Sequence, residues 1–384
     1  MIGICVRYFH ENYGGMLQVF ATTKLLEERG IDYEIIRYKK KKNIIFILKS
    51  LPRLFNNILL NDKYEAIQKR LSLKKYSQFE DANRIRMNAF EEFRKEKFED
   101  KLSDVYFGYE NLKKGTKRYS AVLTGSDQLW SPAGLPTNFY NLMFVPDDIR
   151  KISYASSFGV KYIPWYQKKR TSKFLKRIEY ISMRENSGKC IVKELTGKDV
   201  PVVLDPVFMF DKDGWEKLIP TKRVYENKYI FAYFLGNNSN YRKAVEKLAQ
   251  VTGLKIVTLR HLDQFVEEDE KFGDYAPYDV RPDKFLNLIR GAQYICTDSF
   301  HGAVFSIIHR KQFIVFNRYS DNSRHSKNSR IDSLCQNLGI TNCRYNEDIT
   351  SILKNEIDYT NVEKKYIELK KKSEEYLDKA LSNI

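Results

Sequence analysis

Short apolar runs alternate with longer helix-like stretches over most of the sequence, and this alternation limits the chain to a few folds. The first run, residues 2–6, precedes a stretch with apolar residues at helical spacing that ends at Gly30, and a second run follows at 32–38. A strand, a helix and a strand in this order form a βαβ unit. The sequence therefore predicts an α/β fold built on parallel sheets.

The alternation occurs in two blocks, which predicts two domains because 384 residues are many for one compact domain. Strands are expected within 119–130, 150–160, 177–186 and 200–208, and then at 229–237, 255–260, 294–298 and 313–316. We predict two Rossmann-like, doubly wound domains that face one another across a cleft. The expected units are an N-terminal domain at 1–210 with a helical excursion at about 39–100, a C-terminal domain at 211–350, and a helical tail at 351–384.

The formal net charge of +17 favours an anionic partner, or else reflects a lysine-rich surface. No zinc-finger spacing or RRM signature accompanies the charge, so no nucleic acid partner is predicted. The five cysteines are scattered without a CxxC pair, and the first residues do not read as a signal peptide, which favours a cytoplasmic location. No apolar run reaches the roughly 18 residues of a membrane span, so the protein is expected to be soluble or peripheral.

Polar residues gather at the ends of the expected strands. "ENYGG" follows the first strand, "TGSDQ" follows "AVL", "SS" follows "ISYA", "MRE" follows "IEYI" and "DSFHG" follows "YIC". In parallel sheets these ends share one edge, so the five loops are predicted to converge on one cleft. Each loop taken alone also fits ordinary turn chemistry.

Two of these loops open helices and carry candidate chemistry. In "NYGG" the free N–H groups of Gly14 and Gly15 can receive an anion. In "DSFHG" Ser299 is expected to cap the following helix and to leave N–H groups for a phosphate. His301 stands at this second joint, where a histidine suits general acid or base catalysis. Arg184, and Arg330 in "NSR", are candidate clamps for a carboxylate or phosphate, with surface ion pairs as the alternative reading. The other histidines are read as structural, and no metal or cofactor motif is found, so no cofactor is predicted.

Together, "NYGGMLQVFA", "VLTGSDQLWSP", "ISYASSFG", "ISMRE", "VVLDPVF" and "YICTDSFHGAVFSIIHRKQFIVF" resemble the polysaccharide pyruvyl transferase family, in family order from residue 2 to about 340. The resemblance implies a GT-B-like pair of domains. It also implies transfer of a pyruvyl group from phosphoenolpyruvate (PEP), as a ketal, to a sugar of a cell-surface polysaccharide such as capsule or exopolysaccharide, or of its lipid-linked precursor. The 39–100 excursion and the C-terminal tail match no motif of the family.

The resemblance assigns His301 as the general acid/base and Arg184 as an anchor for PEP. The further substrate-binding positions that it implies lie in four short segments. They are Asn12, Tyr13, Gly14, Gly15 and Gln18, then Ser126, Asp127 and Gln128, then Ser299 and Gly302, and finally Asn328 and Arg330.

Two other functions and one membrane contact stay open. A metal-independent GT-B glycosyltransferase would bind a sugar nucleotide instead of PEP, and a non-catalytic module would bind anionic glycans or lipid without needing His301. The segment 39–60 combines a run of four lysines at 39–42 with apolar residues, a composition typical of peripheral contact with an anionic membrane. A helix packed on the protein, with its lysines in solvent, is the alternative for that segment.

Overall fold

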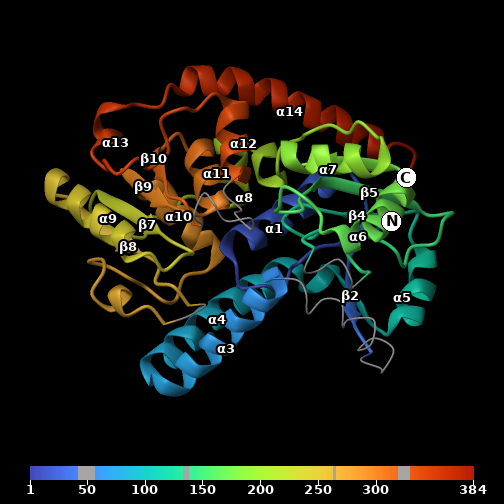
Figure 1. Ribbon diagram of the computed structural model, residues 1–384, viewed down its shortest axis with the longest axis horizontal. Coiled ribbons are helices and arrows are strands. Elements are labelled where there is room, and N and C mark those ends of the chain that lie inside the picture. Colours follow the sequence, from blue (N-terminus) through green and yellow to red (C-terminus); the bar gives the residue numbers. More distant parts are fainter. Residues whose placement is uncertain (42–56, 133–137, 263–264, 319–328) are drawn as a thin grey trace.

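The computed structural model describes residues 1–41, 57–132, 138–262, 265–318 and 329–384. Two parallel β-sheets lie on either side of helix α1 (Tyr13–Glu27), as Figure 1 shows. Both ends of the chain lie at the sheet A side of the molecule, because the last helix crosses from one half to the other. Within the described residues, no helix is both long enough and apolar enough to span a bilayer.

Sheet A belongs to the first half of the chain and has the order β3-β2-β1-β4-β5-β6, with every neighbouring pair parallel. The order reverses between β1 and β4, and in open α/β sheets ligands bind beyond the strand ends at such a switch point. Its strands are β1 (Ile2–Cys5), β2 (Tyr33–Lys39), β3 (Leu102–Phe107), β4 (Ala121–Thr124), β5 (Arg150–Ser156) and β6 (Tyr180–Met183).

Sheet B belongs to the second half, is also fully parallel, and has the order β10-β9-β7-β8. Its switch point lies between β7 and β9. The strands are β7 (Tyr229–Tyr233), β8 (Lys255–Thr258), β9 (Tyr294–Thr297) and β10 (Gln312–Val315).

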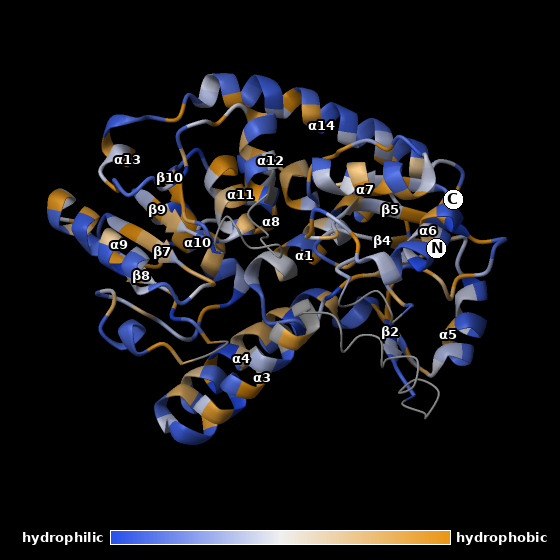
Figure 2. Cartoon of the chain, viewed as in Figure 1, coloured by the Kyte–Doolittle hydropathy of each residue, from blue (hydrophilic) through white to orange (hydrophobic). Residues whose placement is uncertain are grey.

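Helices cover both sheets, and Figure 2 shows apolar strands beneath helices whose outer faces are more hydrophilic. Left-handed glycines end two of them, Gly197 after α7 and Gly253 after α9, where a side chain would be strained. The other described helices are α3 (Asn57–Lys75), α4 (Ser77–Phe98), α5 (Tyr109–Gly115), α6 (Trp165–Arg177), α8 (Lys212–Leu218), α10 (Pro282–Gly291), α11 (Phe300–Ile308), α12 (Ser329–Leu338), α13 (Ser351–Lys354) and α14 (Tyr359–Leu381), with α7 at Asn186–Thr196 and α9 at Ser239–Thr252.

The hydrophobic core is continuous between the two halves of the chain. Tyr13 of α1 stacks on Phe285 of α10, with ring centroids 4.6 Å apart, and its hydroxyl donates to the carbonyl of Val280. Trp215 of α8 packs edge-on against Phe305 of α11. These contacts fix the two sheets relative to one another, so the strand ends that they present also have fixed positions.

Helix α14 is a strap that returns from the second half to the first (Figure 1). Along its length the Tyr366 hydroxyl donates to the Phe208 carbonyl at 2.6 Å, and the Tyr376 hydroxyl donates to the Ser153 carbonyl at 2.9 Å. Between them Ser373 accepts the buried N–H of Leu204 at 2.9 Å. The lysine-rich tail is therefore packed on the first half of the chain.

The predicted α/β class with two doubly wound parallel sheets is confirmed. The strand expected at 200–208 is wrong, because this segment only bridges Met183 through Val202 and then turns. Asp205 accepts the N–H of Val207 and starts a 3₁₀ turn at Pro206, which has no N–H to give to a ladder.

The excursion at 39–100 is helical where it is described, as α3 and α4, and 42–56 lies outside the described residues. Strand β3 was not predicted. It directly follows the helical excursion, and because it lies half-exposed at the edge of the sheet, its sequence is not the continuous apolar run of a buried strand. The domain boundaries at 210 and 350 stay predictions.

Candidate functional site

The turns at the two switch points touch one another. Gly14 lies in the first turn of α1, after β1, and His301 lies in the first turn of α11, after β9. A Cβ atom on Gly14 would fall 2.2 Å from Nδ1 of His301, which no side chain can do without displacing the imidazole. The structure thus brings together the first and the last of the five loops predicted to converge.

Asp205 is the centre of the site. Its Oδ2 accepts hydrogen bonds from the Ser126 hydroxyl at 2.7 Å and from a terminal nitrogen of Arg184 at 2.9 Å, and lies 3.7 Å from Nε2 of His301. Burial alone would raise the pKa of the Asp205 carboxyl, but His301 and Arg184 together lower it below its ordinary value. Asp205 is therefore an ionised carboxylate shared by three side chains from both sheets.

Arg184 follows β6 and is buried with part of its hydrogen-bonding capacity unused. Its Nε and one terminal nitrogen have no hydrogen-bond partner among the described residues. Nε lies 3.8 Å from Oε2 of Glu185, beyond hydrogen-bond range, while Oε1 of Glu185 accepts from the Ser157 hydroxyl. A buried guanidinium with unpaired N–H groups favours an anionic acceptor, since each unmade bond costs about 1–3 kcal/mol.

Phe300 lies against this guanidinium. The central carbon of Arg184 is 4.4 Å from the centroid of the Phe300 ring, and that of Arg330 is 5.6 Å from it. The Gln128 amide, turned with its oxygen toward Arg330, accepts from that guanidinium at 2.8 Å. One aromatic ring thus holds two of the predicted anion-binding arginines in place.

The loop after β4 places Asp127 near the same cations. Gly125 has a φ of +133°, and a Cβ there would lie 1.9 Å from the Tyr154 carbonyl, so the turn requires glycine. Burial would raise the pKa of Asp127, but the positive charges of Arg184 and Arg7 and the neighbouring His301 lower it to about 2. Asp127 is thus negatively charged at neutral pH.

Ser299 caps α11, as predicted, by accepting the N–H of Gly302 at 3.2 Å. The Gly302 N–H, expected to serve a phosphate, is therefore already bonded within the protein. Asp298 just before it accepts the N–H groups of Leu235 and Gly236, which ties the end of β9 to the end of β7.

The start of α1 has a similar internal cap, because Asn12 accepts the N–H of Gly15 at 2.9 Å. Two other predicted positions of this segment face the packed interior. Tyr13 donates to Val280, and the Gln18 amide donates to the Thr22 hydroxyl on the same helix. These two side chains are buried and bonded within the protein. The predicted Asn328 lies outside the described residues.

Three functional candidates were missed in the sequence: Asp205, Phe300 and Glu185. Asp205 interrupts the apolar run "VPVVLDPVF". Because ionised residues are rarely buried without a partner, a carboxylate in such a run could have been predicted to pair with a cation. The run was read as a strand, which hid its role. In the described part of the chain no group of three or more His, Cys, Asp and Glu is placed to hold a metal ion.

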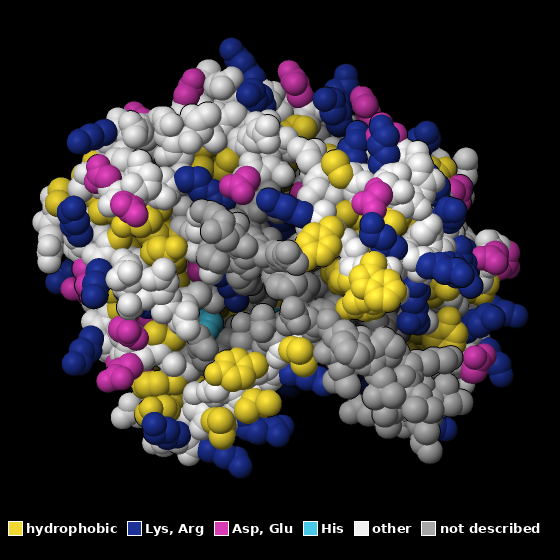
Figure 3. Space-filling model, viewed as in Figure 1, with side chains coloured by type: hydrophobic (Ala, Val, Ile, Leu, Met, Phe, Trp, Pro, Cys, Tyr) yellow, Lys and Arg dark blue, Asp and Glu magenta, His cyan; other side chains and the backbone are white. Residues whose placement is uncertain are grey.

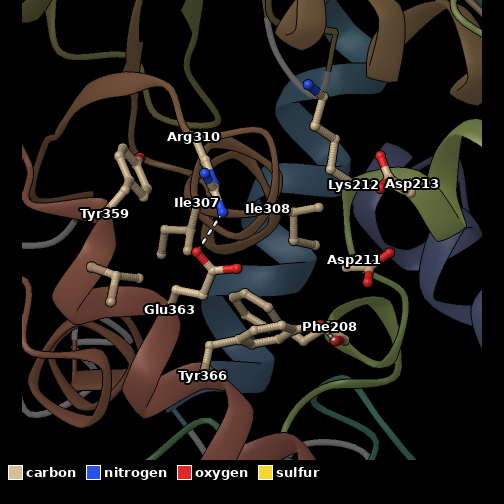
Figure 4. A pocket seen from close by; sticks show the side chains of 11 residues that line it. Phe208, Asp211, Lys212, Asp213, Ile307, Ile308, Arg310, Tyr359, Glu363 and Tyr366 are labelled. Atoms are coloured by element: carbon tan, nitrogen blue, oxygen red, sulfur yellow. Dashed lines mark hydrogen bonds and ion pairs between the residues drawn. The ribbon is translucent and has the colours of Figure 1, made fainter.

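A separate pocket of about 330 Å³ lies at the other end of α11 (Figure 4). Ile307 and Ile308 form one wall, Phe208 lies below them, and an ion pair between Arg310 and Glu363 crosses its side. None of the residues predicted from the sequence lines it. The candidate site therefore stays at the N-terminal end of α11.

Solved structures similar to this chain share little sequence with it. The UDP-GlcNAc 2-epimerase of Neisseria meningitidis has 10% identity and a TM-score of 0.45, covering 99% of this chain and 93% of its own. MurG of Acinetobacter baumannii has 8% identity and a TM-score of 0.44, covering 98% and 97%. A glycosyltransferase of Rickettsia africae has 13% identity and a TM-score of 0.45, covering 100% and 99%. Similarities of this degree carry no inference about ligand or activity.

The sequence comparison is more specific. No protein with a curated description matches the chain. The family described as polysaccharide pyruvyl transferase matches residues 12–320, a span that contains Gly14, Asp205 and His301. Since that span is most of the sequence, the chain belongs to the polysaccharide pyruvyl transferase family.

Proposed function

We propose that this protein transfers a pyruvyl group from PEP to a sugar of a cell-surface polysaccharide or its lipid-linked precursor, and leaves it there as a ketal. The observation that carries the proposal is that two nitrogens of buried Arg184, its Nε and one terminal nitrogen, have no hydrogen-bond partner among the described residues. Arg184 lies beside His301, and Asp205 lies between them. The family supports the transferase class. The donor and the residue roles are our proposal.

PEP fits the charges of this site. It carries a carboxylate and a phosphate, and planar guanidinium groups bind both with paired N–H donors. Arg184 offers its Nε and one terminal nitrogen, and Arg330 lies on the same Phe300 ring. We assign the anionic groups of PEP to these two arginines.

His301 then supplies the proton transfers. It gives a proton to the methylene carbon of PEP, which becomes a methyl group and leaves C2 electron-poor. A sugar hydroxyl adds to C2 and returns a proton to His301. A second hydroxyl of the same sugar replaces the phosphate at C2, and its proton leaves with the phosphate. The products are the cyclic ketal and inorganic phosphate.

Asp205 lies beside the ring of His301. Its Oδ2 is 3.7 Å from Nε2 of His301, so the carboxylate can orient the imidazole toward the substrate. Gly14, in the first half of the chain, lies against the ring and limits its orientation. A histidine held in one orientation is suited to transfer a proton to a fixed carbon of the substrate.

Calorimetric titration with PEP, and with UDP in parallel, tests the donor. We expect PEP to bind, and Arg184→Lys to raise its Kd by about tenfold or more, because lysine keeps the charge near Asp205 but loses the paired donors. Arg177→Lys is the matched control, since Arg177 donates to the carbonyls of Met143 and Val145. Binding of UDP without PEP would instead indicate a sugar-nucleotide transferase.

Two histidines on one helix test the catalytic role. His301→Ala is expected to lower PEP-dependent phosphate release by roughly 100-fold or more, as for other general acids. His309→Gln alters the C-terminal cap of the same helix and should leave the rate within about twofold. Equal rates for His301→Ala and the wild type would contradict the role of His301.

A further inference from the structure

Helix α3 exposes an apolar face that no described part of the protein covers. Leu60, Tyr64, Ile67 and Leu71 are between 43% and 63% exposed. Their spacing of four, three and four residues places them within one narrow stripe, because each residue turns the helix by 100°. Figure 3 shows hydrophobic side chains gathered over the α3–α4 hairpin at the lower edge of the molecule, with Lys and Arg side chains around them.

Positive charge borders this stripe. The 100° turn per residue places Lys63 and Arg70 along one side of the stripe and Lys75 along its other side. Lys74 lies beyond the C-terminal end of the stripe. All four side chains are exposed. The sequence of α3 contains five Lys and Arg against two Asp and Glu, so the border is cationic.

The hairpin is firmly attached to both halves of the protein. Phe90 of α4 packs on Tyr13, and Arg86 donates to the carbonyls of Pro277 and Tyr278 in the second half. At the far end, Tyr76 stacks on Phe265 at 4.0 Å. A surface that holds α3 therefore orients the whole molecule.

A second copy of the chain is a poor partner for this face. The spacing of the stripe would suit a pair of α3 helices packed along it. In any symmetric pair, however, the residues that flank the stripe on one helix lie next to those that flank it on the other. Those border positions are Lys63 and Arg70 on one side, and Gln68 and Lys75 on the other. Cations would face cations or a neutral amide, which opposes association.

An anionic lipid surface satisfies both features. A helix that lies in a membrane interface buries its apolar stripe among the acyl chains, and the lysines beside it meet anionic headgroups. Tyr64 in the stripe belongs to the residues enriched at such interfaces. We propose that the α3 face, defined as Leu60, Tyr64, Ile67 and Leu71 with the bordering Lys63, Arg70, Lys74 and Lys75, docks on anionic phospholipid. The proposal is independent of the donor and of His301.

Sedimentation of the full chain with vesicles tests it. We expect binding to phosphatidylglycerol vesicles at low salt, weaker binding at high ionic strength, and little binding to phosphatidylcholine. Ile67→Glu/Leu71→Glu should lower the bound fraction on phosphatidylglycerol at least tenfold. The matched control is Val251→Glu/Ile367→Glu, at positions 58% and 59% exposed on α9 and α14, which should bind like the wild type.

Two results would overturn the proposal. The first is no binding to phosphatidylglycerol, or binding that survives the change at Ile67 and Leu71. The second is a dimer in analytical ultracentrifugation that the same variant converts to monomer, which would assign the α3 face to a second copy. Because all four substituted positions are exposed, thermal melting of both variants should match that of the wild type and so exclude misfolding.

Discussion

Nε2 of His301 lies 3.7 Å from Oδ2 of Asp205, the same oxygen that accepts from Arg184 and Ser126. His301 belongs to the second half of the chain, and Arg184 and Ser126 belong to the first. One carboxylate oxygen thus connects the candidate acid/base to the candidate anion anchor across the two sheets. The geometry makes Asp205 a positioning residue for both.

Asp205→Asn should destabilise the fold as well as lower turnover. The substitution keeps the shape but removes the carboxylate that accepts a hydrogen bond from buried Arg184, and breaking a buried ion pair typically costs about 3–5 kcal/mol. Urea unfolding at neutral pH measures this loss. Ser126→Ala, which removes one hydrogen bond to the same oxygen, should cost about 1–2 kcal/mol.

A double variant identifies the cause. If the broken ion pair between Arg184 and Asp205 accounts for the loss, Arg184→Met/Asp205→Leu should be more stable than Asp205→Asn alone, because it removes both partners of that pair and fills the space. A double variant no more stable than Asp205→Asn would mean that the loss has a cause other than the broken ion pair. Neither variant should turn over PEP.

Gly14→Ala should inactivate the protein through His301. The new Cβ would lie 2.2 Å from Nδ1, so the ring must rotate or α1 must shift, and we expect turnover to fall at least about tenfold. Steady-state phosphate release with PEP measures the effect. Gly15→Ala is a matched control, since its Cβ would meet Asn12 at 3.5 Å, an ordinary contact. Both changes raise helix propensity equally, so propensity cannot explain a difference.

The sequence was sufficient for the fold class because its signals are local and repeated. The strand–helix alternation and the polar strand ends predicted two parallel sheets, and the topology rule then placed Gly14 and His301 at facing edges. Ser299 was correctly expected to cap α11, because a cap depends only on residues three positions apart.

Contacts between residues far apart in the chain could not be predicted from the sequence. Nothing local indicates that Asp205 meets His301, 96 positions later, or that Phe300 lies on Arg184. Tyr13 was read as a ligand residue because of its neighbours in "NYGG", although its burial depends on Phe285 of α10. Strand β3 pairs only at a sheet edge, where weak alternation gives little pattern to detect.

Phe300→Leu should weaken PEP binding without changing the rate at saturation. The ring lies 4.4 Å from the centre of the Arg184 guanidinium, and a buried cation–π contact contributes about 0.5–2 kcal/mol, which corresponds to roughly 2- to 30-fold in Kd. Calorimetry with PEP measures the shift. Phe305→Leu on the same helix loses a similar area against Trp215 and should keep the wild-type Kd.

Ser373→Ala should destabilise the attachment of α14. The Ser373 hydroxyl accepts the buried N–H of Leu204 at 2.9 Å, and without it that N–H has to remain unpaired, at a cost of about 1–3 kcal/mol. Urea unfolding should show this loss. Ser382→Ala, which removes an exposed contact with the carbonyl of Lys379, should be within about 0.5 kcal/mol of the wild type.

His309 links stability to pH because it is buried as a neutral ring. Burial, followed by the positive charges of Arg290, Lys311 and Lys212, lowers its pKa from 6.5 to about 3. Its Nε2 has no hydrogen-bond partner in the described part of the chain. Between pH 6.5 and about 3 the unfolded chain therefore binds a proton that the folded chain does not, and stability falls as the pH falls.

The wild type should accordingly lose about 2 kcal/mol of unfolding free energy through this histidine between pH 7 and pH 5, and His309→Gln should not. Urea unfolding of both proteins at the two pH values isolates the effect, because carboxylates that titrate over the same range contribute equally to each. His10→Gln, at an exposed histidine, should follow the wild type. If His309→Gln and the wild type lost the same unfolding free energy between the two pH values, His309 would not be the cause. The folded protein would then accept the proton on His309, for example by rotating the ring so that water reaches it beside Arg290.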